Sequence, residues 1–218
     1  TIELDISQDI IKGNYATILF KGTVLFNFTN SNNLPYYNKF TNVCELYVKN
    51  ISEDKQNSIC LNLQNEEKEI SHIRFENINI QDFYYAIYIF KNAYAINFEH
   101  CDVLNCTNAV YMPAQGSNYG EKISLSNCLI YNGTNAITNL NQNGAIFLDN
   151  CSIDYNEIAT KTSGNSKIHI TNSHMEGKQQ FIGNATVINS EVLFLKLENK
   201  NIFETYENSI IQFNNCHI

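Results

Sequence analysis

The sequence predicts an all-β fold, a single-stranded right-handed parallel β-helix with three short strands in each rung. Three observations indicate it: a short apolar pattern recurs along the chain, an Asn stands at the same place in most copies, and Cys and Ile interchange directly after that Asn. A repeat of this length is typical of solenoids, in which each unit buries its apolar face against its neighbours. We therefore expect one rung for each copy.

The repeat is clearest in residues 122–130, where apolar residues alternate before Asn127 and Cys128 follows it. The anchor residue recurs every 17 to 27 residues, at Asn50, Asn77, His100, Asn127, Asn150, Asn172, Asn189 and Asn215. Alternation within each stretch predicts strands, and its slip by one residue at the anchor predicts a bend. Asn suits the bend because it tolerates left-handed backbone angles and its amide can bond to the rungs above and below.

Each rung is expected to hold three strands. The first ends each preceding copy, as in residues 86–88 and 109–111; the second precedes the anchor, and the third follows it. Residues 1–43 lack the regular pattern and are interpreted as an N-terminal cap or irregular first rungs. Residues 44–218 are interpreted as β-helix, truncated at the C-terminal end because the last rung stops in mid-strand. The unbroken series of anchors indicates one elongated domain.

Composition fits a filled core and argues against several classes of partner. Hydrophobic residues make up 44% of the 218 residues, and no apolar run approaches the length that spans a membrane. The 14 Lys and Arg residues against 22 Asp and Glu residues give a net charge of −8, which argues against nucleic-acid binding. We expect neither a nucleic-acid nor a membrane partner, and no signal peptide is visible.

Four of the seven Cys residues share one repeat position, where Ile78 and Ser173 stand in other rungs. Interchange with Ile favours buried free thiols over disulfides.

Because apolar side chains fill the coil, chemistry is expected on the outward positions, which form columns across the rungs. One column on the third strand contains Asn79, Asp102, Leu129, Ser152, His174, Glu191 and His217. The next contains Gln81, Leu104, Tyr131, Asp154, Glu176 and Leu193. Asp154 and Glu176 are then neighbours one rung apart, about 4.8 Å along the stack, with His174 on the same face. No other patch combines two carboxylates and a His so closely.

Two adjacent carboxylates cannot both ionise freely, so one can act as a general acid while the other stays charged. Glycoside hydrolysis requires such a pair. The alternative is an ordinary solvated strand face in a protein with 22 acidic residues. The His residues show no metal-binding spacing and no Ca²⁺ loop motif is present, so we expect no metal and no cofactor.

Further candidate substrate-binding residues come from the same columns and from the first strands. Tyr88 and Tyr111 end successive first strands and are expected to stack on the outside, where their ring faces can bind sugars. Stacked aromatic residues also stabilise ladders or oligomer contacts, so both interpretations stay open. The other candidates are Tyr131, which shares the column of Asp154 and Glu176, and Asp102 and Glu191, which share the column of His174.

The Asn ladder and the stacks of like residues over about residues 45–218 resemble the pectin-lyase-like β-helix superfamily. Lyases, hydrolases, esterases, adhesins and viral spikes share that scaffold, so this resemblance implies a fold rather than an activity. Members like pectate lyase use an Arg base with Asp residues that hold Ca²⁺. Here the single Arg, Arg74, lies rungs away from Asp154, which counts against that chemistry.

Residues 173–177, Ser-His-Met-Glu-Gly, resemble the Ser-His-aromatic-Glu-Gly segments of β-helical bacteriophage tailspikes, with Met175 in place of the aromatic residue. This resemblance implies a homotrimeric spike on the virion tail, outside the cell, that binds and hydrolyses a bacterial surface polysaccharide such as a capsule. Carried over, Glu176 is the acid, Asp154 its partner, and His174 orients the substrate. The alternatives are a non-catalytic glycan-binding spike or adhesin, and a polysaccharide lyase on the same fold.

Overall fold

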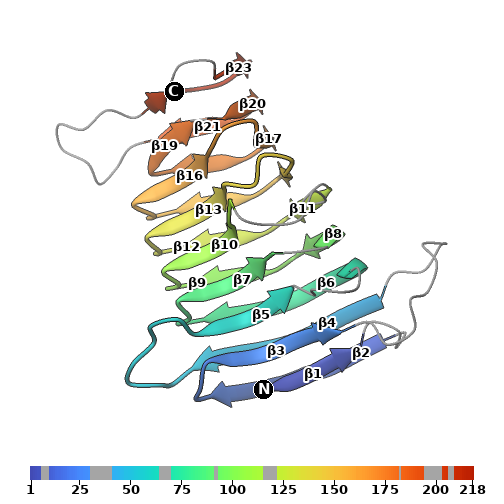
Figure 1. Cartoon of the computed structure of the whole chain (residues 1–218). Coiled ribbons are helices and arrows are strands. Elements are labelled where there is room, and N and C mark those ends of the chain that lie inside the picture. Colours follow the sequence, from blue (N-terminus) through green and yellow to red (C-terminus); the bar gives the residue numbers. More distant parts are fainter. Residues whose placement is uncertain are drawn as a thin grey trace.

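The computed structural model describes residues 1–5, 10–29, 41–63, 70–90, 93–114, 122–181, 183–193, 203–205 and 209–218. Their strands stack in parallel as the rungs of a right-handed β-helix, with the two chain ends at opposite ends of the stack (Figure 1). The predicted fold class is confirmed. The described part of the chain contains no helix that could cross a membrane.

The first strands of successive rungs form one sheet, which has nine strands within the described residues. They are β1 (Ile2–Asp5), β3 (Val24–Thr29), β5 (Ile59–Leu63), β7 (Tyr85–Ile89), β10 (Asn108–Met112), β13 (Asn135–Asn139), β16 (Ile158–Thr162), β19 (Lys178–Phe181) and β22 (Phe203–Thr205).

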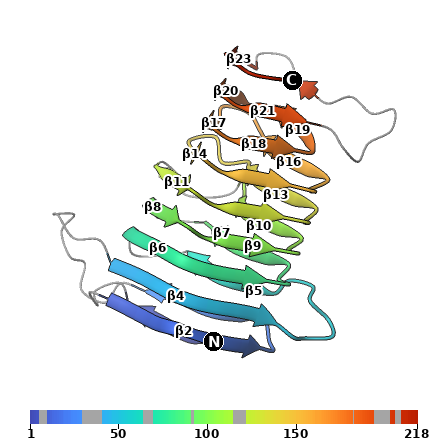
Figure 2. The same ribbon diagram turned by 180° about the vertical axis from the view of Figure 1, so that it is seen from behind.

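The strands on both sides of the bend belong to a second sheet, which has 14 strands in the described part of the chain. Figure 2, with the molecule turned by 180°, shows this sheet. Three long strands run through the bend: β2 (Ile10–Phe20), β4 (Thr41–Asn50) and β6 (Ile70–Gln81). Those before the bend are β8 (Ala93–Glu99), β11 (Ile123–Ser126), β14 (Ala145–Asp149), β17 (Lys167–Thr171), β20 (Asn184–Ile188) and β23 (Ile211–Asn214). Those after it are β9 (Asp102–Leu104), β12 (Leu129–Tyr131), β15 (Ser152–Asp154), β18 (His174–Glu176) and β21 (Glu191–Leu193).

Residues with a left-handed backbone make the bend, as predicted. The angle φ lies between 49° and 55° at Asn77, His100, Asn127, Asn150, Asn172, Asn189 and Asn215. The amide ladder lies on the surface and is made of separate pairs. Asn150 Nδ2 donates to Asn127 Oδ1 at 2.6 Å, and Asn215 Nδ2 to Asn189 Oδ1 at 2.8 Å.

One predicted anchor, Asn50, was wrong. The pairing of β4 with β6 places Glu45 opposite Asn77, and Glu45 has the left-handed backbone, with a φ of 59°. Asn50 is buried at the next corner of that rung, where its Nδ2 donates to Ser58 Oγ at 3.0 Å. An Asn followed by an apolar residue therefore does not distinguish the two corners.

The described part of residues 1–29 belongs to the stack. β1 pairs with β3, and β2 pairs with β4. The register of the second pair shifts between Lys12 and Ala16, because extra residues of β2 lie opposite the bend of β4. The first rung is thus irregular at its bend.

Apolar side chains fill the coil from end to end. The Phe75 and Phe98 rings stack with centroids 4.8 Å apart and planes 6° apart. Cys101, Cys128 and Cys151 are buried, and each thiol lies within hydrogen-bonding distance of backbone carbonyls. All seven cysteines are free, which confirms the prediction of stacked thiols.

Phe75→Ala is expected to lower the free energy of unfolding by about 3–5 kcal/mol, because the fully buried ring leaves a cavity between rungs that cannot collapse. Phe147, whose side chain is 40% exposed, is the matched control, and Phe147→Ala should cost less than about 1 kcal/mol. Chemical denaturation of both variants measures the difference. Equal losses would contradict the assignment of Phe75 to the core.

Candidate functional site

The third strands place the outward columns in the predicted order. Parallel pairing aligns, rung after rung, Asp102, Leu129, Ser152, His174, Glu191 and His217. In the neighbouring column, Tyr131 pairs with Asp154 and Glu176 pairs with Leu193.

Asp154, His174 and Glu176 meet at the surface. His174 Nε2 lies 3.4 Å from Asp154 Oδ1 and 3.5 Å from Glu176 Oε1. One donor atom from each of the three residues lies within 4.8 Å of the other two. The side chains of His174 and Asp154 are 31% and 24% exposed, whereas that of Glu176 is only 9% exposed. The cluster is therefore open to solvent on the side of His174 and Asp154.

Glu176 reaches this position because the ladder of backbone hydrogen bonds changes beside it. At an equivalent corner, the Asn132 N–H donates to the Asp154 carbonyl of the next rung at 3.0 Å. At the following corner, the Tyr155 N–H donates instead to Glu176 Oε2, also at 3.0 Å. A side-chain carboxylate thus takes the place of a backbone carbonyl. This hydrogen bond explains why Glu176 is buried and how its second oxygen is aimed at His174.

Gly177 allows this arrangement. Its φ of 127° is one that residues with a side chain rarely adopt, and a Cβ there would lie 2.5 Å from the Asn156 carbonyl oxygen. The corner is also short, because Lys178 already pairs with Ile158 of the preceding rung. The chain closes onto that rung at Gly177 and draws Glu176 inward.

Neighbouring residues support both ends of the cluster. Ser152 Oγ donates to the two Asp154 oxygens at 3.0 and 2.9 Å. Glu191 lies between two rings, 2.8 Å from His174 Nδ1 and 3.0 Å from His217 Nδ1. Column position could have identified Ser152 and His217 as partners in the sequence. No sequence signal identifies Tyr155, because it acts through its backbone N–H.

The surrounding carboxylates favour a protonated His174. Partial burial opposes the charged ring, but hydrogen bonds with Glu191 and Glu176 and the charge of Asp154 outweigh it and raise the pKa of His174 above its ordinary value of 6.5. The hydrogen bonds from His217 and His174 lower the pKa of Glu191. His174 therefore lies between carboxyl groups from three strands, Asp154, Glu176 and Glu191.

Asp154, His174 and Glu176 also have the donor types that bind divalent transition metals. A metal at this position would need the lone pair of His174 Nε2, which a neutral ring with its proton on Nδ1, toward Glu191, offers. A proton and a metal would therefore compete for this nitrogen.

The other predicted residues lie at different distances from the cluster. Tyr131 is one rung from Asp154, and its ring centroid is 5.3 Å from that of Tyr155. Asp102, two rungs from Ser152, accepts a hydrogen bond from Asn79 at 3.4 Å. The structure therefore brings Tyr131 and Glu191 to the cluster and leaves Asp102 further along the same face.

Tyr88 and Tyr111 lie on the other sheet, where β7 pairs with β10. Their rings stack with centroids 5.9 Å apart and planes 21° apart, and Tyr85 lies 5.0 Å from Tyr111. They form an aromatic surface that is separate from the carboxylate cluster.

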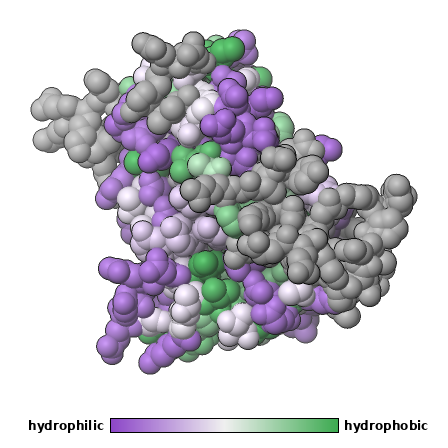
Figure 3. Space-filling model, in the orientation of Figure 1, coloured by the Kyte–Doolittle hydropathy of each residue, from purple (hydrophilic) through white to green (hydrophobic). Residues whose placement is uncertain are grey.

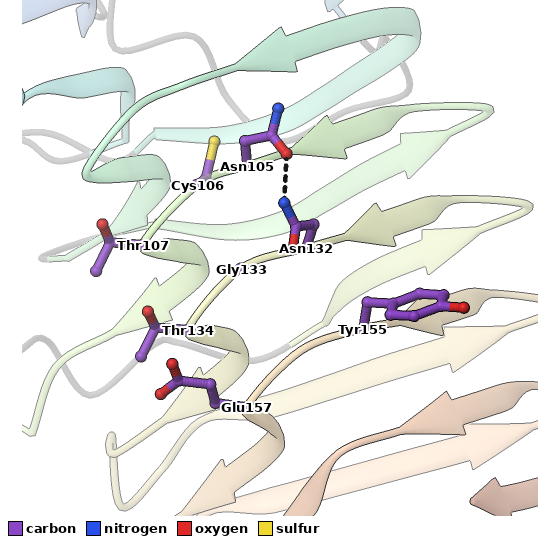
Figure 4. A pocket seen from close by; sticks show the side chains of 8 residues that line it. All are labelled: Asn105, Cys106, Thr107, Asn132, Gly133, Thr134, Tyr155 and Glu157. Carbon is purple, nitrogen blue, oxygen red and sulfur yellow. Dashed lines mark hydrogen bonds between the residues drawn. The ribbon is translucent and has the colours of Figure 1, made fainter. Parts of the chain in front are cut away.

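A shallow groove of about 220 Å³ crosses the corners of three rungs next to the cluster. Figure 4 shows two rows of side chains along it, Asn105, Asn132 and Tyr155 in one and Thr107, Thr134 and Glu157 in the other. On the face seen in Figure 3, hydrophobic side chains emerge only in small patches between hydrophilic ones. The groove is likewise polar.

No family model and no curated protein matches this chain. Among solved structures, it is similar to the enzymatically active domain of tailspike protein 4 from bacteriophage CBA120, with a TM-score of 0.79 and 20% sequence identity. This chain has the fold of a phage tailspike. The match covers 99% of this chain and 33% of the other, so the chain spans about a third of that tailspike domain.

His174 of this tailspike fold is expected to titrate above pH 6.5 and His169 below it. Partial burial and the charge of Lys167 lower the pKa of His169, which makes it an internal control. Because the folded-state pKa of His174 is raised, its stabilising contribution is complete below the unfolded pKa and is lost as pH rises through the folded value.

Histidine NMR titration of the chain and of Glu191→Gln measures this. The Glu191→Gln variant should lower the midpoint pH of the His174 titration, because Glu191 contacts the His174 ring. The midpoint pH of His169 should stay unchanged. A His174 midpoint at or below 6.5 would contradict the network.

Proposed function

We propose that this chain is part of a phage tailspike that binds a bacterial surface polysaccharide and hydrolyses it at Asp154, His174 and Glu176. The observation that carries the proposal is the buried Glu176 carboxylate, held by a backbone N–H within 4.8 Å of Asp154. The similarity of this chain to an enzymatically active tailspike domain supports a location on the virion tail and a glycan as the target. A homotrimer is part of the same proposal.

The separation of the carboxylates favours a double displacement. Retaining glycosidases hold their two carboxyl groups about 5–5.5 Å apart, whereas inverting ones need roughly 6.5–9.5 Å for a water molecule between them. The short distance between Asp154 and Glu176 fits the first arrangement. The Ser152 hydroxyl donates to Asp154, which suits the member of the pair that stays charged.

In the first step, Glu176 gives its proton to the glycosidic oxygen as the bond from that oxygen to the anomeric carbon breaks. An Asp154 oxygen bonds to the anomeric carbon and forms a glycosyl ester. In the second step, water attacks the anomeric carbon, Glu176 takes the proton of that water, and Asp154 leaves as a carboxylate. One water is consumed and one reducing end appears. His174, between the two carboxylates, holds them and orients the sugar.

The position of Arg74 favours hydrolysis over a lyase reaction. Its guanidinium Nη2 donates to Glu99 Oε2 at 2.6 Å and lies 3.7 Å from Glu76. Arg74 is therefore bound to carboxylates of β6 and β8. Because it is the single Arg of the sequence, the Asp154 cluster has no Arg that could act as a base.

Glu176→Gln is expected to reduce cleavage at least about a hundredfold, because the amide cannot donate the proton, while fold and glycan binding remain. The assay measures new reducing ends on a panel of purified bacterial surface polysaccharides and follows ultraviolet absorbance for unsaturated products. Glu53→Gln, at an exposed position, is the matched control.

Activity should survive EDTA, because the proposed steps use no metal. Ultraviolet-absorbing products would indicate a lyase, and loss of activity in EDTA would assign the cluster to a metal. Full activity of Glu176→Gln would refute the site.

The stacked tyrosines support a second function, a spike that binds glycan without cleaving it. Three tyrosine rings within 6 Å of a neighbour, Tyr85, Tyr88 and Tyr111, offer ring faces to sugars. On this alternative, Tyr111→Ala weakens binding about tenfold while no reducing ends appear with any variant. Tyr47→Ala, a 41% exposed tyrosine on the other sheet, is the control. Binding that is equal in both variants would exclude the tyrosine surface.

A further inference from the structure

The corner groove is built from the same turn in three successive rungs. Each turn starts with a left-handed residue, and φ is 55° at Asn105, 57° at Asn132 and 57° at Tyr155. At the centre of the groove, a Cβ on Gly133 would lie 2.5 Å from the Cys106 carbonyl oxygen, so only Gly lets the corners pack this closely. The groove is therefore a regular feature of the backbone and not an accident of loop shape.

The polar groups along the groove are available to a ligand. Asn132 Nδ2 donates to Asn105 Oδ1 at 2.9 Å, which leaves Asn105 Nδ2 and Asn132 Oδ1 without partners among the described residues. The hydroxyls of Thr107 and Thr134 likewise have no partner within the described part of the chain. A row of donors, acceptors and hydroxyls matches the hydroxyl groups of a sugar. The 43% exposed ring of Tyr155 adds a face for the C–H groups of such a ring.

Charge in the groove selects among sugars. Glu157 lines it and has no ion-pair partner among the residues that the structure describes. Lys178, which pairs in the strand ladder with Ile158 next to Glu157, forms its ion pair with Glu204. An uncompensated carboxylate repels uronates, phosphates and sulfates, and accepts hydrogen bonds from hydroxyl or ammonium groups.

Tyr155 connects the groove to the carboxylate cluster. Tyr155 is one of the residues that line the groove, and its backbone N–H holds Glu176 Oε2 at 3.0 Å. We infer that the corner groove is a subsite for an uncharged or amino-bearing sugar residue, adjacent to the residue whose glycosidic bond is cleaved. The adjacency rests on the proposed function, whereas the subsite itself rests on the groove. The groove has a volume of about 220 Å³, which is enough for a sugar ring.

Binding is measured in the Glu176→Gln background, with immobilised bacterial polysaccharides of three kinds: uncharged, amino-bearing and uronate-containing. Tyr155→Asn removes the aromatic ring and introduces the residue type that stands at the equivalent corner position in the two preceding rungs, Asn105 and Asn132. It should weaken binding about tenfold. Thr134→Arg, which fills the groove, should abolish binding at this subsite. Glu157→Gln should raise the affinity for uronate-containing polymers relative to the others.

Three variants are matched controls. Tyr15 is exposed and has a φ of 57°, so Tyr15→Asn repeats the Tyr155 change in the first rung. Thr17→Arg and Glu53→Gln repeat the other two changes at exposed positions away from the groove. All three should bind as the background does.

The outcomes separate the two proposals. If the groove variants bind normally while Glu176→Gln stops cleavage, the subsite is refuted and the hydrolase stands. If they lose binding but the original chain releases no reducing ends, the subsite stands and the hydrolase is refuted. Binding to uronate-containing polymers alone, or to none of the three kinds, would refute the subsite.

Discussion

The parallel backbone ladder is the constraint on which the rest of this structure depends. Each rung is too thin to satisfy its own N–H and carbonyl groups, so each must donate to and accept from both neighbouring rungs. The corners must then repeat in register. Left-handed residues such as Asn127 and Asn132 recur at successive corners because this backbone angle turns the chain sharply within one residue.

The candidate site lies where one bond of this ladder is replaced. Tyr155 keeps its N–H satisfied, but by the carboxylate of Glu176 and not by a carbonyl. Gly177 and the short corner after it make the substitution sterically possible. The carboxyl group of a side chain is thus held as firmly as a backbone group. Preorganised carboxylates of this kind are what acid–base chemistry on a glycan requires.

The same ladder relates the cluster to the groove. Because the corners of adjacent rungs stack, side chains that are more than 20 residues apart in the chain form continuous rows, as Asn105 and Asn132 do. Tyr155 belongs both to such a row and to the support of Glu176. A polymer lying along the corners would therefore pass from the polar rows directly to the carboxylates, whereas the Tyr88 and Tyr111 rings lie on the other sheet.

The fold class, the left-handed bend, the free buried thiols and the outward columns that contain Asp154, His174 and Glu191 could be predicted from the amino-acid sequence. Strand alternation and the anchor residue depend on side-chain type, and parallel stacking converts equal position in the repeat into contact. Three features could be found only in the folded chain: Glu45 and not Asn50 makes its bend, Glu176 is buried, and Tyr155 supports Glu176. Those features depend on a backbone N–H donor and on the length of one corner, and the repeat pattern of side-chain types contains information on neither.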